Sequence, residues 1–218
     1  LSTYKIKTPR FRVFSSICTS TRTNLKFPVI VKPNAEGSSK GISDVAVAEN
    51  AEELRFLIEK NISAYGEPVL AEEFIQGREF TVAIVGNGNE TVIFPPMEIK
   101  YKKRGQKYNI YSYSVKKNYK DYVDYTCPAE IDKTLEKKMK DMAGKIYRLL
   151  ECRDFSRIDF RLSEEGEVYF IEINPLPGLA PGYSDYPMIT QFNGIGYTDT
   201  IKMILNSALK RYGIKELN

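Results

Sequence analysis

Four polar residues late in the chain have types and spacing that could bind a metal ion and a phosphate group. Arg157 and Asp159 stand two positions apart in one largely apolar segment. Glu172 and Asn174 stand two positions apart in the next. If Glu165-Gly166 is a two-residue turn between antiparallel strands, Asp159 faces Glu172. Arg157 then faces Asn174, and all four side chains share one face of the hairpin, because strand side chains alternate between faces.

Two carboxylates that face each other across a sheet repel unless a cation lies between them. Asp159, Glu172 and the amide oxygen of Asn174, together with phosphate oxygens, form a donor set that suits Mg²⁺ or Mn²⁺. Arg157 could hold a phosphoryl group or a developing oxyanion. The alternative is a solvated face with an Arg–Asp pair. That alternative does not explain why the strand runs directly into the rigid turn Asn174-Pro175-Leu176-Pro177-Gly178.

The other face of this hairpin is expected to be apolar. With the same turn, three cross-strand pairs would be buried: Ile158 with Ile173, Phe160 with Ile171, and Leu162 with Tyr169.

The composition excludes several kinds of chemistry. The 218 residues include no histidine, which excludes a Ser-His-Asp triad, a Cys-His dyad and the commonest zinc ligands. A net charge of +4 suits a phosphate-bearing ligand but is too small to favour nucleic acid. No apolar run approaches the roughly 20 residues of a membrane span, and no signal peptide is evident. Three widely spaced cysteines favour a reducing cytoplasm.

The elements that must position these residues mix helices and strands, as in α+β layers. Asn50 and Glu53 resemble a capping box before a helical stripe of Leu54, Leu57 and Ile58. A second helix is indicated by Leu135, Met139, Met142, Ala143, Ile146 and Leu149, and a third begins near Thr198. Strands are expected at 27–33, 42–48, 68–75, 80–85, 156–163 and 167–173, with a hairpin turn at Asn87-Gly88.

Residues 98–126 are less regular and rich in lysine and tyrosine. Three interpretations remain open for them: a loop that covers phosphate, a solvated hairpin, or a binding strip for single-stranded nucleic acid.

These motifs, in this order, resemble one enzyme family. An Arg-x-Asp strand, a turn and Glu-x-Asn before a proline–glycine turn are similar to the magnesium site of ATP-grasp ligases. Phe27–Gly41 resembles the strand and phosphate loop of D-alanine–D-alanine ligases, and residues 72–80 resemble their adenosine-binding connector. Cys127-Pro128-Ala129 and the segment from Pro177 to Ser184 are also similar. No single motif is decisive, but five in the family's order, over nearly the whole chain, are specific.

The resemblance implies a role for each candidate residue. Lys32 and the backbone of the loop containing Gly37, Ser38 and Ser39 would bind the ATP phosphates. Glu72 would accept from the adenine amino group, the backbones of Glu73 and Ile75 would read the ring edge beside Phe74, and Glu79 would bind the ribose. Asp159, Glu172 and Asn174 would hold Mg²⁺ or Mn²⁺. Arg157 would steady the transferring phosphate and the tetrahedral intermediate, Lys117 would face the phosphates, and Ser184 would contact a substrate carboxylate. If the family resemblance is set aside, the glutamates are interpreted as ordinary solvated residues and Phe74 as a core residue.

The fold implied is an ATP-grasp fold of class α+β, in which two α+β subdomains sandwich ATP. Residues 1–85 would form the central subdomain with the phosphate loop, and residues 86–218 the C-terminal subdomain with the magnesium site. The family's N-terminal domain is expected to be absent from this chain.

The reaction implied is amide formation between two small-molecule substrates, a carboxylate and an amine, through an acyl phosphate. The family's setting would be cytoplasmic peptidoglycan synthesis for the cell wall, with no nucleic-acid or membrane partner. Asn118 departs from the tyrosine expected after Lys117, so the identity of the substrates, amino acids in the family, stays open. Two alternatives also remain: a nucleotide-binding module that is inactive by itself, and another ATP-grasp chemistry. The oligomeric state is open, a homodimer included.

Overall fold

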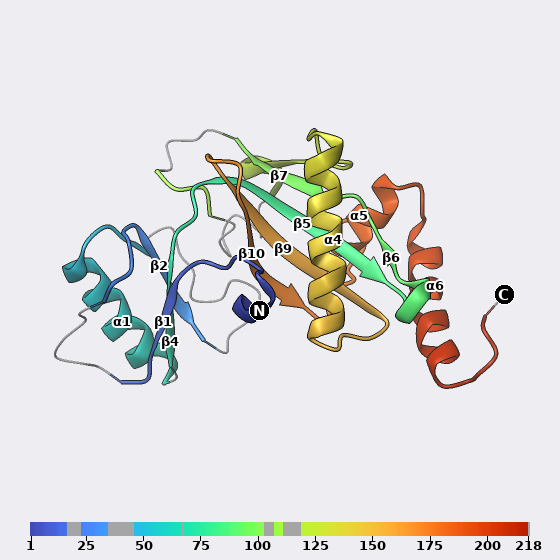
Figure 1. Ribbon diagram of the computed structural model, residues 1–218, viewed down its shortest axis with the longest axis horizontal. Coiled ribbons are helices and arrows are strands. Elements are labelled where there is room, and N and C mark those ends of the chain that lie inside the picture. The colour runs from blue at the N-terminus through green and yellow to red at the C-terminus, as the bar shows by residue number, and fades with distance from the viewer. Residues whose placement is uncertain (17–22, 35–45, 67, 103–106, 111–118, 218) are drawn as a thin grey trace. The chain divides into compact units, whose positions relative to one another are not determined.

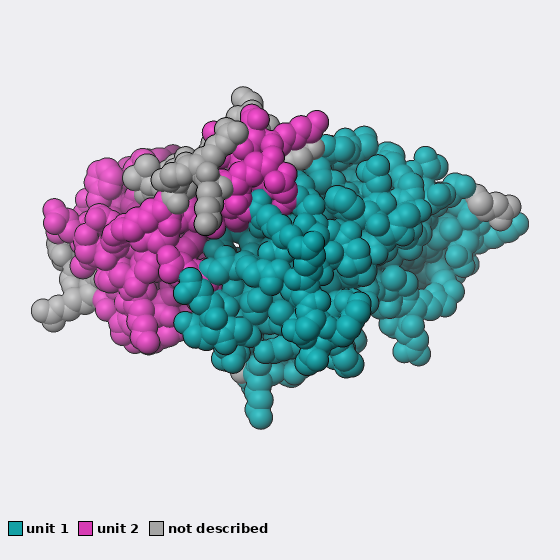
Figure 2. Space-filling model, turned by 90° about the horizontal axis from the view of Figure 1, so that it is seen from above, with its two compact units in different colours: residues 1–8, 77–100, 125–218 teal, residues 9–76, 101–124 magenta. Residues whose placement is uncertain are grey.

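The computed structural model describes residues 1–16, 23–34, 46–66, 68–102, 107–110 and 119–217. Its contacts divide the chain into two compact units (Figure 2). Unit 1 comprises Leu1–Thr8, Gly77–Lys100 and Tyr125–Asn218, and unit 2 comprises Pro9–Gln76 and Tyr101–Asp124. The predicted boundary between subdomains at residues 85 and 86 remains a proposal. In the grouping by contacts, Gly77–Val85 belongs to unit 1, because this strand pairs with the strand that carries Asp159.

Unit 2 is built on a four-stranded antiparallel sheet. In the order β1-β4-β2-β3, its strands are Phe11–Phe14, Val69–Glu73, Val29–Pro33 and Val47–Ala48. In β2, Val29 and Val31 are fully buried while the intervening Ile30 and Lys32 turn to the other face. Helix α1 (Ala51–Tyr65) packs Leu54, Leu57 and Ile58 into the same core, which confirms the predicted stripe.

The start of α1 confirms the predicted cap in a modified form. The Asn50 side chain accepts hydrogen bonds from the backbone N–H groups of Glu52 and Glu53. The Glu53 carboxylate in turn accepts from the Asn50 side chain and from the backbone of Glu49, one residue earlier than in a standard capping box.

Unit 1 contains most of a larger sheet with the strand order β10-β9-β5-β7-β8, in which β6 also pairs with β5. Only Tyr101 of β7 and Val123 and Asp124 of β8 are grouped with unit 2. The bounds are Val168–Asn174 for β10, Phe155–Ser163 for β9, Gly77–Val85 for β5, Met97–Tyr101 for β7, Val123–Thr126 for β8 and Val92–Ile93 for β6. Helix α4 (Lys133–Leu149) lies across one face of this sheet (Figure 1). Its Met139, Ala143 and Ile146 are fully buried against β5, β9 and β10, as the helical spacing predicted.

Helices α5 (Asp185–Phe192) and α6 (Tyr197–Arg211) follow β10, and the short helices are η1 (Ser2–Tyr4), η2 (Gly88–Glu90) and α3 (Tyr119–Tyr122). The expected hairpin at Asn87-Gly88 forms, but with a longer connection that contains η2 before β6 pairs with β5. Of the expected strand 42–48, residues 46–48 are described, and Val47 and Ala48 form β3. None of the helices in the described part of the chain is long and apolar enough to cross a membrane.

The turn between β9 and β10 was predicted wrongly. Ser163 and Glu167 close a loop of three residues rather than two, and Gly166 occupies its left-handed position at φ 80°. Beyond this turn the pairs are Leu162 with Val168 and Phe160 with Phe170, so Val168 and Phe170 are buried in place of Tyr169 and Ile171.

A β-bulge corrects the register before the polar residues are reached. Between Phe170 and Glu172 the pairing shifts by one residue, which leaves Ile171 as the extra residue of β10. Because the bulge offsets the longer turn, Ile158 faces Ile173 as predicted.

Candidate functional site

The β9–β10 hairpin brings four of the predicted site residues together. Asp159 faces Glu172 and Arg157 faces Asn174, as the sequence predicted. On the other side of β9, Asp159 lies opposite Thr81 of β5. Asp159 therefore occupies a middle strand of the sheet, with polar neighbours on both adjacent strands.

Hydrogen bonds from three side chains orient the Asp159 carboxylate. The hydroxyl of Thr81 donates to Oδ1 at 2.6 Å. Arg157 donates from Nε to Oδ1 at 3.0 Å and from Nη2 to Oδ2 at 2.9 Å. The amide of Asn174 donates to Oδ2 at 3.2 Å. Such a network restricts the rotation of the Asp159 side chain.

The arrangement fits a hard divalent cation. The Asn174 amide also donates to Glu172 Oε1 at 3.1 Å, so one group reaches both carboxylates. Among the described residues there is no group of three or more His, Cys, Asp and Glu side chains that could hold a metal. A cation here would take the two carboxylates and oxygens from a bound ligand, which is the pattern of Mg²⁺ bound with a nucleotide. The Asn174 amide would turn its oxygen toward the cation, because its nitrogen faces both carboxylates in this structure.

Arg157 is a buried cation between carboxylates. It is 8% exposed, and its Nη1 lies 3.1 Å from Oδ2 of Asp185, which is 2% exposed. Burial opposes the charged form, but the carboxylates of Asp159 and Asp185 outweigh this effect and raise the pKa of the guanidinium above its ordinary value. Arg157 is thus a permanent positive charge whose position depends on two aspartates.

Ser184 occupies the N-cap position of α5 without a side-chain capping hydrogen bond, and its hydroxyl instead closes the loop after β10. Its Oγ accepts from the backbone N–H of Ala180 at 3.2 Å. A Cβ at Gly178 would lie 2.8 Å from this oxygen, so a larger residue there would displace the Ser184 hydroxyl. Ser184 is 8% exposed, and its predicted contact with a substrate carboxylate stays a prediction.

In unit 2, two of the predicted nucleotide residues form an ion pair. Lys32 Nζ lies 2.6 Å from Glu72 Oε2, and both side chains are largely buried. Ile30 and Glu72 are partners across β2 and β4, and Lys32 is two residues further along β2 on the same face as Ile30. The pair holds the lysine ammonium beside the sheet.

The residues after Glu72 are partly engaged by the fold. The Glu73 carboxylate accepts from the backbone N–H of Lys26 at 2.8 Å, and its own N–H donates to the carbonyl of Arg10. The N–H of Phe74 donates to the carbonyl of Pro28. The Phe74 ring packs edge-on against Tyr108 with centroids 5.3 Å apart. Like Ile75, Phe74 is only partly buried, so it is not simply a core residue.

Glu79 lies in unit 1 on β5 and is paired with a second buried arginine. Arg161 of β9 faces Glu79 and donates from Nη2 to its Oε2 at 2.7 Å. The predicted ribose contact would therefore use a carboxylate whose position Arg161 controls.

The predicted site residues thus fall into two groups. Unit 1 carries Glu79, Ser184 and the hairpin residues, and unit 2 carries Lys32 and residues 72–75. Gly37, Ser38, Ser39 and Lys117 lie outside the described residues.

The sequence did not single out Thr81 and Asp185, which contact the candidate site. Thr81 could have been found only by knowing that β5 pairs with β9, because 78 residues separate it from Asp159. Asp185 follows Ser184 directly, and an acidic residue in a first helical turn is an ordinary capping feature, so nothing in the sequence marked it out.

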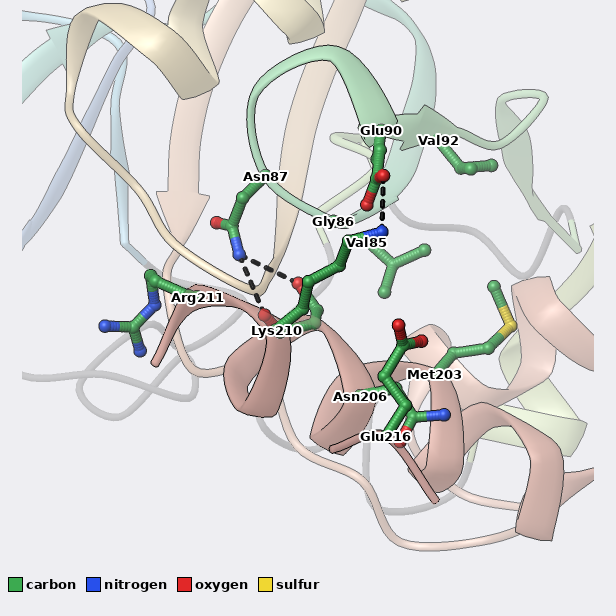
Figure 3. Close-up of a pocket in the computed structure, with 11 residues that line it drawn as sticks. Val85, Gly86, Asn87, Glu90, Val92, Met203, Asn206, Lys210, Arg211 and Glu216 are labelled. Carbon is green, nitrogen blue, oxygen red and sulfur yellow. Dashed lines mark hydrogen bonds and ion pairs between the residues drawn. The ribbon is translucent and has the colours of Figure 1, made fainter. Parts of the chain in front are cut away.

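A cavity of about 440 Å³ elsewhere in unit 1 contains none of these residues. It lies beside α6 and the β5–β6 connection (Figure 3). Several of its polar side chains pair with neighbouring groups: Lys210 with Glu90, Asn87 with Ser207, and Arg211 with Asp154. We interpret these pairs as contacts that stabilise the packing of α6 beside the sheet.

If these contacts stabilise the packing of α6, removing one of them should lower the free energy of unfolding. Asp154 accepts a bidentate hydrogen bond from Arg211, which lowers the pKa of the carboxyl below its ordinary value. Asp154→Asn should lower the free energy of unfolding at pH 7 by about 1–3 kcal/mol. Asparagine tolerates the left-handed backbone at this position, where φ is 67°, so the loss would report the charge.

The pH dependence follows from the lowered pKa. The stabilisation is present above the unfolded-state pKa of about 3.9 and is lost as the pH falls through the folded-state value. The difference between the variant and the unaltered chain should therefore narrow below about pH 4, as measured by urea denaturation. Asp141→Asn, which removes an exposed carboxylate paired with Lys137, is the control and should change stability by less than about 1 kcal/mol. A constant difference across this pH range would contradict the interpretation.

Comparisons with known proteins identify the family and the fold of this chain. The family model described as "D-ala D-ala ligase C-terminus" matches residues 5–206. The D-alanine–D-alanine ligase of Cupriavidus necator is 33% identical over 208 residues, which cover 94% of this chain and 60% of that protein. The chain therefore spans about three fifths of the length of such curated relatives.

Solved structures show the same fold. The VanG D-Ala:D-Ser ligase from Enterococcus faecalis aligns with a TM-score of 0.75 at 27% identity, covering 94% of this chain and 58% of that one. The D-alanine–D-alanine ligase from Bacillus anthracis, solved in complex with ATP, aligns with a TM-score of 0.76 at 21% identity, covering 97% and 64%.

Proposed function

Because the chain belongs to the D-ala D-ala ligase C-terminal family and has the ATP-grasp fold, we propose that it binds Mg·ATP as part of a carboxylate–amine ligase. The observation that carries the proposal is the Asp159–Glu172 pair on facing strands, with Asn174 within hydrogen-bonding distance of both carboxylates. Opposed carboxylates in a sheet are stabilised by a cation. The D-alanine–D-alanine ligase from Bacillus anthracis was solved with ATP, which supports nucleotide binding in a protein of the same fold.

The proposed roles divide between metal, phosphate and base. Asp159, Glu172 and Asn174 would hold Mg²⁺, which when bound supplies positive charge to the phosphoryl oxygens. Arg157 would hold the transferring phosphoryl group from a fixed position. Lys32 would exchange its contact with Glu72 for the ATP phosphates, together with Lys117 and the backbone of Gly37, Ser38 and Ser39. Glu72, Glu73, Phe74, Ile75 and Glu79 would contact the nucleoside, and Ser184 a substrate carboxylate.

The reaction proposed is amide formation between two amino acids. ATP transfers its terminal phosphoryl group to a substrate carboxylate, and the amine of the second substrate displaces phosphate from the resulting acyl phosphate. The named substrates differ among similar proteins, D-Ala with D-Ala in one and D-Ala with D-Ser in another, so the second substrate is the variable one in this proposal. A cytoplasmic role in peptidoglycan synthesis would follow.

A second candidate is nucleotide binding without amide formation by this chain alone. The relatives' greater length is the observation behind it. Incubation with Mg·ATP and a panel of D- and L-amino acids, followed by mass spectrometry, separates the two. A dipeptide supports the ligase, and binding without a dipeptide supports the second candidate.

Magnesium-dependent nucleotide binding is the first test of both. At a free concentration of 100 times its Kd, Mg·ATP should raise the free energy of unfolding by about 2.7 kcal/mol, which is measurable as an increase in Tm. Glu172→Gln should lose the part of the shift that depends on magnesium, because one of the two anionic ligands is gone. Glu164→Gln removes an exposed charge from the tip of the same hairpin and should behave as the unaltered chain. An equal shift in Glu172→Gln would rule out the metal site.

A further inference from the structure

Arg157 is held from two directions by carboxylates on different elements. Nε and Nη2 contact Asp159, two residues away on β9. Nη1 contacts Asp185 at the start of α5. With two of its nitrogen atoms hydrogen-bonded to Asp159 and the third in an ion pair with Asp185, the guanidinium has little freedom to rotate or withdraw.

If the proposed function holds, the Asp159 carboxylate binds two positive groups, Arg157 and the cation. Both of its oxygen atoms accept from Arg157, and the same oxygens would serve as ligands of a divalent cation. A cation that draws on Asp159 weakens its hold on Arg157. Because Arg157 is 8% exposed, water can replace little of that lost contact, and a buried charge without compensation is strongly unfavourable.

Asp185 is placed to compensate for this loss. It belongs to α5 rather than to the hairpin, so a cation bound by Asp159, Glu172 and Asn174 leaves its charge available to Arg157. The next residue fixes the helix: the Tyr186 hydroxyl donates to the carbonyl of Ile84 at 3.0 Å, and its ring packs edge-on against Phe155. Tyr186 is 1% exposed, so Asp185 is held by the core of unit 1.

We propose that Asp185 is a positioning residue, which keeps Arg157 in place for phosphoryl transfer while Asp159 binds the divalent cation. This inference rests on the proposed function. It assigns to Asp185 no contact with substrate. Its effect passes through Arg157, and its consequence is that the cation and Arg157 need not compete for a single carboxylate.

The affinity for the metal tests this directly. Without the Asp185 charge, Arg157 depends more heavily on Asp159, so a cation must displace a stronger interaction. Asp185→Asn should weaken Mn²⁺ binding about 10–100-fold, measured by electron paramagnetic resonance with a saturating non-hydrolysable ATP analogue. In turnover at saturating Mg²⁺, the same variant should lower kcat for ATP while KM for ATP stays nearly unchanged, since the protein's own contacts to the nucleotide are kept.

Two comparisons separate positioning from a merely structural role. Tyr186→Phe removes the hydroxyl contact that anchors α5 and should lower the Tm while leaving Mn²⁺ affinity and kcat unchanged. Asp185→Glu and Asp185→Gln have the same size and differ in charge, so they test the inference even if Asp185→Asn does not fold. Asp185→Glu should bind Mn²⁺ more tightly than Asp185→Gln.

The outcomes are distinguishable from failure of the proposed function. If the unaltered chain binds neither the nucleotide analogue nor Mn²⁺, the proposed function fails and this inference with it. If the unaltered chain binds both, and the Asp185 variants bind Mn²⁺ equally well, only the role of Asp185 is overturned.

Discussion

Asp159→Asn should reduce magnesium-dependent ATP turnover by roughly 10²–10³-fold, the range seen when one preorganised electrostatic group is removed from an active site. Asparagine has the shape of aspartate but no charge, and two consequences follow at once. The proposed cation loses one of its two anionic ligands, and the buried Arg157 loses the carboxylate that receives two of its hydrogen bonds. Phosphate release in the presence of Mg²⁺ and ATP measures the effect.

A nearby substitution serves as the control for Asp159→Asn. Thr81→Val removes the hydroxyl that donates to Asp159 at 2.6 Å but leaves the carboxylate charged. Its effect on turnover should be much smaller. If Asp159→Asn turned over ATP as fast as Thr81→Val, the charge of Asp159 would have no part in the reaction.

Phe160→Ala should lower the free energy of unfolding by about 3–5 kcal/mol, the usual result of truncating a fully buried aromatic residue. Phe160 is 0% exposed, lies on β9 between β10 and β5, and packs edge-on against Phe170 with centroids 6.5 Å apart. Urea denaturation followed by circular dichroism measures the change. Phe160→Leu largely fills the same space and should lose less than about 1.5 kcal/mol.

The position of Phe160 links stability to the candidate site. It precedes Arg161 and follows Asp159 on one strand, so the strand's apolar residues face α4 while its charged residues face the other way. If Phe160→Ala lowered the free energy of unfolding no more than Phe160→Leu, the neighbouring side chains would have collapsed into the space left by the ring.

Local patterns in the sequence were enough to predict the helices α1 and α4 and the polar face of the hairpin. The helical stripes are strong because several apolar residues repeat at helical spacing. The pairing of Asp159 with Glu172 was predicted correctly through two errors that cancelled: the turn has one residue more than expected, and the bulge at Ile171 takes up the difference. No feature of the residue types near Ile171 distinguishes a bulge from regular pairing.

The remaining features depend on contacts between distant segments. β1 is short and exposes Phe11 and Val13, so its pattern is not that of a buried strand, and it forms through pairing with β4. The contacts of Asp159 with Thr81 and of Arg157 with Asp185 likewise depend on which strand and helix pack beside β9. Spacing along a chain predicts partners within a hairpin but not partners from a third element.

The bulge at Ile171 has a consequence for comparing this hairpin with others by alignment. A hairpin with a two-residue turn and no bulge would have the same number of residues between its Asp159 and Glu172 equivalents. The two would align without a gap, yet residues 168–171 would point to opposite faces. An alignment of the two hairpins would then match residues that face the core in one with residues that face away from it in the other. The proposed metal-binding positions would still be matched correctly.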